Sequence, residues 1–195
     1  MQYKNAFEQL GTSKEAVYFN KKNNELIENL QKNKFLQDDR HNMAKKIGSQ
    51  DEAILKDLQA LGYTSETIPL LYLIPLLYVA WSEGRVTKRE RTLLLSLARS
   101  SQIKENTKAY QKLIDWIKHK PTSHFFYQSL ALLRNVVDSQ PIPTREVTKF
   151  GLVSNCVRLA KVSGGFWRLG SISSTEFEAI EKVNRELEND QLYKA

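Results

Sequence analysis

The sequence predicts an all-α protein, a compact helical bundle of two pseudo-repeated helix-loop-helix units with an N-terminal helical extension. Residues 84–90 and 170–176 share the pattern Gly-x-(Val/Ile)-(Ser/Thr)-x-x-Glu. In this pattern the Ser or Thr hydroxyl accepts from the N–H three residues on, and the Glu carboxylate reaches back to the N–H of the cap, which is a capping box at a helix start. The same spacing occurs at residues 12–15 and 49–52, and no Asn-Gly or Asp-Gly hairpin signal is present. Helices are therefore favoured over strands.

Residues 1–48 are predicted to form a polar helical extension, and residues 49–195 the main helical domain. The extension is rich in Asn, Gln and Lys, and Phe19, Leu26 and Leu30 give it one apolar stripe. That stripe is sufficient for docking on the chain's own bundle, which we favour, or on another chain.

The segment after Ser49 has apolar residues at helical spacing, so a short amphipathic helix is expected, with Gly62 closing it. The longest uncharged run, residues 67–82, is apolar on every side, as in a helix surrounded by others. Its 16 residues fall short of the roughly 20 that cross a bilayer. We therefore expect a buried central helix that Pro75 kinks, freeing the carbonyl of Leu71.

Helices continue along the rest of the chain. Pro121, Pro141 and Pro143 supply breaks between them. The expected helices cover about residues 88–101, 105–119, 123–139, 144–163 and 174–191.

The formal net charge of +7 is concentrated in residues 85–120, which hold ten Lys or Arg residues against three acidic ones. Lys104, Lys108 and Lys112 recur every four residues and are expected to line one helix face. Such a block ordinarily forms a solvated surface, and its functional alternative is binding to an anionic partner. The candidate residues for that binding are Arg85, Lys88, Arg89, Lys104, Lys108 and Lys112.

An anionic partner of this block could be a phospholipid surface, giving a peripheral membrane contact, a nucleic acid or an acidic protein. Tyr110 and Trp116 are the only aromatic residues in the block, which disfavours base stacking and hence nucleic acid. The last predicted helix carries several Glu residues, so an acidic face of the same chain is a further alternative.

Composition places the chain among intracellular globular proteins of one main domain. Cys156 is the single cysteine, which excludes an internal disulfide framework and fits a reducing compartment. No cationic-apolar signal peptide opens the chain. A cytoplasmic location is expected.

Residues 76–91, Leu-Leu-Tyr-Val-Ala-Trp-Ser-Glu-Gly-Arg-Val-Thr-Lys-Arg-Glu-Arg, resemble an apolar helix running into Ala-Asp-Gly-x-(Ile/Val)-x-x-x-Glu. This signature is similar to that of the TerB-like (tellurite-resistance protein B-like) group, and residues 160–176 resemble a later helix-loop-helix of bacterial members. The resemblance implies a compact bundle of pseudo-repeated halves, a bacterial cytoplasmic setting, a link to metal stress and acidic metal-binding patches. Glu83 stands where the family usually has Asp, and Glu90 matches the second acidic position.

Three acidic residues, Glu83, Glu90 and Glu176, are therefore candidate ligands for a divalent cation. Helix capping is the ordinary role of Glu90 and Glu176, and a hard cation needs several oxygen ligands, so no specific metal site and no other cofactor are expected. Trp167 and Arg168, in a glycine-rich loop that lacks the lysine of a phosphate-binding loop, are candidates for a partner surface.

No nucleophile and base are recognisable as a pair, so the sequence favours a non-catalytic role over an enzyme. The function predicted is that of a TerB-like binding or adaptor protein, related to stress response, that contacts an unidentified protein or an anionic surface. A divalent-metal sensor is the alternative, and a nucleic-acid-binding protein or an enzyme is less favoured.

Overall fold

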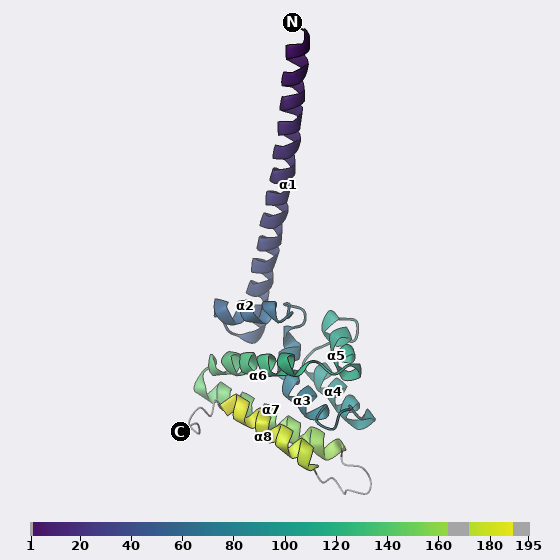
Figure 1. Cartoon of the computed structure of the whole chain (residues 1–195). Helices are drawn as coiled ribbons and strands as arrows, with labels where there is room; N and C mark the ends of the chain where they lie inside the picture. Colours follow the sequence, from purple (N-terminus) through teal and green to yellow (C-terminus); the bar gives the residue numbers. More distant parts are fainter. Residues whose placement is uncertain (1, 164–171, 189–195) are drawn as a thin grey trace, which may run out of the picture. The chain divides into compact units, whose positions relative to one another are not determined.

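The computed structural model describes residues 2–163 and 172–188. These residues form eight α-helices and one 3₁₀ helix and contain no strand, which confirms the all-α class (Figure 1). The elements in chain order are α1 (Gln2–Ile47), α2 (Glu52–Ala60), η1 (Ile68–Leu73), α3 (Ile74–Ala80), α4 (Lys88–Ser100), α5 (Lys108–Lys118), α6 (Ser123–Asp138), α7 (Ile142–Ser163) and α8 (Ser174–Glu188).

The chain divides into two compact units, residues 1–39 and 40–195. The first unit is a single helix, the long N-terminal part of α1. This helix passes through Thr12 without a break, so the helix start predicted there is wrong. No proline precedes Thr12 to interrupt helical hydrogen bonding, and the single Gly11 is tolerated inside a helix.

The second unit begins inside α1, earlier than the expected domain boundary at residue 49. Met43 and Ile47, from the last turns of α1, belong to its hydrophobic core. Their position shows that the end of the polar extension is part of the folded bundle.

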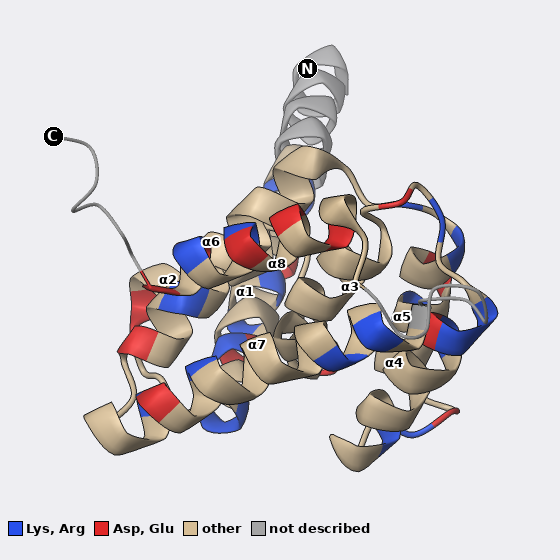
Figure 2. Ribbon diagram, turned by 90° about the horizontal axis from the view of Figure 1, so that it is seen from below, with Lys and Arg blue, Asp and Glu red and all other residues tan. Residues whose placement is uncertain are grey.

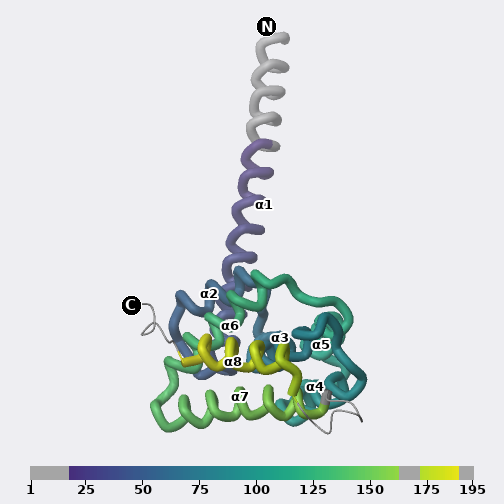
Figure 3. The backbone as a smooth tube through the Cα atoms, turned by 60° about the horizontal axis from the view of Figure 1, so that its bottom comes forward, coloured from purple at the N-terminus to yellow at the C-terminus, as the bar shows by residue number. Residues whose placement is uncertain are grey.

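Helix α3 forms the centre of the second unit, where it contacts η1, α4, α6, α7 and α8 (Figure 3). Leu77 and Val79 are completely shielded from solvent, as are Ile68 and Ile74. The uncharged run therefore forms the core, as predicted. Helices α7 and α8 lie side by side, and each contacts both α3 and α6.

Pro75 does not kink one long helix, as was expected, but divides the run into η1 and α3. It stands in the first turn of α3, where its missing N–H costs no intrahelical hydrogen bond. The carbonyl of Leu71 is not free, because it accepts from the backbone N–H of Ile74. The tighter 3₁₀ turn accommodates the proline.

Capping chemistry fixes several of the helix starts. The boxes at Thr87 and Ser173 are both present: each Glu carboxylate accepts from the N–H of its cap, over 2.6 Å at Glu90 and 2.8 Å at Glu176. At α2 the prediction was wrong, since Asp51 and not Ser49 caps the helix by accepting from the N–H of Ala53 over 2.8 Å. Asp is an equally strong cap and stands next to the first helical residue.

None of the helices in the described ranges combines the length and the apolar character that a bilayer-spanning segment needs.

Candidate functional site: an aromatic pocket beside helix α5

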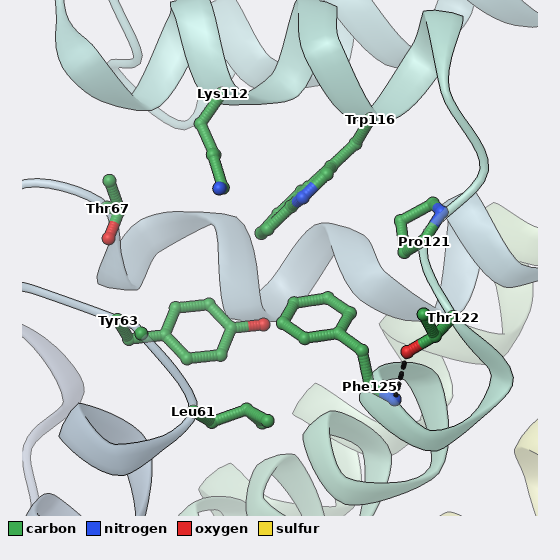
Figure 4. A pocket seen from close by; sticks show the side chains of 9 residues that line it. Leu61, Tyr63, Thr67, Lys112, Trp116, Pro121, Thr122 and Phe125 are labelled. Carbon is green, nitrogen blue, oxygen red and sulfur yellow. Dashed lines mark hydrogen bonds between the residues drawn. The ribbon is translucent and has the colours of Figure 1, made fainter.

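Three separate parts of the second unit surround a pocket of about 290 Å³ (Figure 4). The segment between α2 and η1 forms one wall, helix α5 a second, and the linker into α6 a third. The lining residues are Leu61, Gly62, Tyr63, Thr67, Lys112, Trp116, Pro121, Thr122 and Phe125.

The first wall is set by the turn that ends α2. Gly62 has a φ of +90°, a conformation that glycine adopts without the steric cost of a side chain. The N–H of Tyr63 then donates to the carbonyl of Leu58 over 3.0 Å, which closes the helix end. This turn directs the Tyr63 ring into the bundle, where its hydroxyl donates to Ser129 Oγ over 3.0 Å. Burial raises the pKa of Tyr63 well above its ordinary value.

The rings of Tyr63, Trp116 and Phe125 pack against one another. The ring centroids of Tyr63 and Phe125 are 6.0 Å apart in a stacked arrangement, and those of Trp116 and Phe125 are 5.1 Å apart. The backbone carbonyl of Trp116 also accepts from Trp81 Nε1 over 2.9 Å, so α5 is attached to the end of α3. The aromatic walls of the pocket are therefore held in place before any ligand arrives.

Lys112 supplies the positive charge at this pocket. Its Nζ lies 5.7 Å from the centroid of the Trp116 ring, and its side chain extends from α5 toward the opening between Thr67 and Trp116 (Figure 4). Opposite, the Thr122 hydroxyl accepts from the N–H of Phe125 over 3.1 Å and caps α6. The pocket thus has an apolar interior and a positively charged side chain at its rim.

The other candidates for anion binding do not line this pocket. Lys104 precedes α5 instead of sharing its face, because the Thr107 hydroxyl accepts from the N–H of Tyr110 and starts the helix at Lys108. The predicted three-lysine helix face is therefore wrong. Lys108 is paired with Glu66 over 2.7 Å on the surface.

Arg85, Lys88 and Arg89 lie at the start of α4, exposed to solvent. None of them forms an ion pair with a residue in the described parts of the chain. Basic and acidic segments alternate around α4 and α5 (Figure 2). The basic block is therefore spread over α4, α5 and the segments beside them, and of the six candidates for anion binding Lys112 alone lines the aromatic pocket.

The acidic candidates come together at this same N-terminal end of α4. Glu90 and Glu176 are both buried in capping boxes. Burial raises the pKa of Glu90; the hydrogen bonds from Thr87 oppose the shift, while the charges of Glu176 and Glu83 add to it. Glu90 and Glu176 thus lie close enough for their charges to interact. Among the described residues, however, no group of three or more His, Cys, Asp or Glu side chains is arranged to hold a metal ion.

Two candidates and the single cysteine remain. Trp167 and Arg168 lie outside the described residues, so their role in a partner surface stays a prediction. Cys156 is completely buried, and this burial raises the pKa of its thiol, which makes it unreactive.

The sequence identified Trp116 only as one of two aromatic residues in the basic block and did not connect it with Tyr63 and Phe125. The Gly62 turn and the Thr122 cap could each be recognised from neighbouring residues. No sequence pattern indicates that these two segments lie next to each other in the fold. No protein-family model, curated protein or solved structure matches this chain, and its function is therefore inferred from its own residues.

Proposed function

We propose that this chain is a non-catalytic binding protein whose aromatic pocket receives a large apolar side chain from an acidic segment of a partner protein. The observation that carries the proposal is the pocket of mutually packed Tyr63, Trp116 and Phe125 rings with Lys112 at its rim.

The volume of the pocket indicates which kind of group it can bind. Its volume of about 290 Å³ is at or below the lower end of the roughly 300 to 1,000 Å³ found for small-molecule and cofactor sites. One aromatic or aliphatic side chain fits such a space better than a cofactor does. Anchor side chains in preformed, desolvated pockets contribute much of the affinity of protein interfaces.

The charge around the pocket indicates which residues should stand on either side of that side chain in the partner. Lys112 is exposed at the rim, and the segment 85–120 that contains it has a net charge of +7. Acidic residues on either side of an apolar anchor would complement this surface and speed association. We therefore favour an acidic peptide segment over a neutral or basic one.

The TerB-like motif at residues 76–91 supports the same general role, and with it a bacterial, cytoplasmic, stress-related adaptor. The proposal needs no cofactor. The metal-sensor alternative is less favoured because the carboxylates of Glu90 and Glu176 are engaged by the N–H groups of their own caps.

A titration monitored by backbone-amide NMR tests the proposal. The probes are two short peptides with glutamates on both sides of a central residue, phenylalanine in one and alanine in the other. The phenylalanine peptide should shift the signals of Trp116 and Phe125, and the alanine peptide should bind several-fold more weakly. Lys112→Glu should weaken binding several-fold at low salt and less at high salt, since screening shortens the reach of an exposed charge.

Lys118→Glu is the matched control, because Lys118 is exposed on the same helix but does not line the pocket. It should leave the affinity nearly unchanged. Equal binding of the two peptides, or equal losses in the two charge reversals, would overturn the proposal.

A further inference from the structure

A second pocket, of about 560 Å³, lies among the end of α3, the start of α6 and helix α8. It shares no residue with the aromatic pocket. Its lining is rich in cations and hydroxyl groups, among them Ser82, Lys120, Ser123, Tyr127, Lys182 and Arg185.

Three cations line this second pocket, Lys182 and Arg185 from α8 and Lys120 from the segment before α6. Lys120 donates from Nζ to the carbonyl of Trp81 over 3.3 Å, and Lys182 donates from Nζ to the Tyr127 hydroxyl over 2.7 Å. Neither these two lysines nor Arg185 has an acidic partner within salt-bridge distance in the described ranges. Two carboxylates are near, Glu178 in the lining and Glu186 beside Lys182. Counting the lining residues alone, the pocket has an excess of positive charge.

Neutral hydrogen-bond donors complete the lining. Ser123 and Thr175 stand in the first turns of α6 and α8, helices of 16 and 15 residues, whose N-termini carry partial positive charge. Ser82 Oγ is buried and has no hydrogen-bond partner within the described structure. A buried hydroxyl without a hydrogen-bond partner is energetically unfavourable, so rotation of Ser82 toward an acceptor in the pocket would be favourable.

From this arrangement we infer that the second pocket binds a small organic phosphate monoester. A phosphate carries a charge of about −1.5 to −2 at neutral pH and three acceptor oxygens, which matches the two ammonium groups, the guanidinium and the several hydroxyls that line one pocket. The volume of about 560 Å³ leaves room for an organic group beside the phosphate. The exposed ring of Tyr127, which also lines the pocket, provides an apolar surface for it.

Calorimetric titration with AMP tests this inference, with adenosine as the phosphate-free control and inorganic phosphate as a competitor. AMP should bind, adenosine should bind at least about tenfold more weakly, and inorganic phosphate should compete. Lys182→Gln and Arg185→Gln should each weaken AMP binding about tenfold, as expected for the loss of a charge-assisted hydrogen bond. Circular dichroism should show that both variants keep the helical fold.

Lys112→Gln is the matched control, since it removes the same charge at the aromatic pocket and should leave AMP binding unchanged. Absence of AMP binding, adenosine binding as tight as that of AMP, or equal AMP affinity in the wild type and both pocket variants would overturn the inference. Binding to phosphatidic-acid vesicles without any binding of AMP or inorganic phosphate would also overturn it, in favour of a lipid headgroup. These outcomes are independent of the peptide titration, which depends on Lys112 and not on Lys182.

Discussion

The two pockets combine aromatic rings with lysines, but they place them differently. In the aromatic pocket the Tyr63 and Trp116 rings are nearly inaccessible to solvent and part of the core, while the single cation is at the rim. In the second pocket Tyr127 is 42% exposed, and its hydroxyl is held by Lys182. The rings of the first pocket are therefore fixed by core packing, whereas Tyr127 and the cations of the second pocket keep contact with solvent.

This difference determines what each pocket can recognise. Rings fixed by packing offer a constant shape, which suits an apolar anchor whose affinity comes from burial. Cations that retain solvent contact adjust to a ligand and act through charge, which salt weakens. The two pockets should therefore respond differently to truncation, to loss of a helix cap and to pH.

Truncation of one ring in each pocket should give the largest contrast. Trp116→Ala should lower the free energy of unfolding by about 3 to 5 kcal/mol, because it removes a large buried side chain. Tyr127→Ala should cost about 1 kcal/mol or less, since that ring lies largely on the surface. Urea unfolding monitored by circular dichroism measures both values. Similar losses in the two variants would show that the aromatic pocket is not part of the core.

The helices could be predicted from the sequence where nearby residues decide the structure. The Thr87 and Ser173 boxes and the burial of residues 68–80 were predicted correctly, because capping and apolar patterning act over a few residues. Errors arose where two local signals competed. Asp51 replaced Ser49 as the cap of α2, and Thr107 started α5 after Lys104.

The pockets could not be predicted in this way, because their walls come from segments far apart in the chain. Tyr63, Trp116 and Phe125 meet only when α5 and α6 pack beside the turn after α2. Lys120 and Lys182 likewise meet only after α8 returns to α6, which it contacts. The sequence identified a basic block, but only the packing of the helices shows that Lys112 lines the aromatic pocket and Arg85 does not.

Loss of a helix cap should affect one pocket more than the other. Ser173→Ala and Thr87→Ala should each lower stability by about 0.5 to 2 kcal/mol, because each removes an N-cap hydroxyl. Ser173 also begins the helix that places Thr175 in the second pocket, so its variant should in addition weaken AMP binding. Thr87→Ala is the matched control and should not change AMP binding. Equal AMP affinity in the two variants would show that AMP binding does not depend on the N-terminus of α8.

The smallest expected effect is the order in which the tyrosines of the two pockets lose their protons. The hydrogen bond and positive charge of Lys182 lower the pKa of Tyr127, whereas burial raises that of Tyr63. Ultraviolet absorbance of tyrosinate should therefore show Tyr127 ionising early and Tyr63 only on unfolding. Since the folded pKa of Tyr127 lies below its unfolded value of 10.0, the stability it contributes is complete above pH 10 and is lost as the pH falls through the folded pKa. Tyr127→Phe should remove the early transition, and Lys182→Gln should move it to higher pH. Persistence of that transition in Tyr127→Phe would contradict the assignment, because another tyrosine would then be responsible.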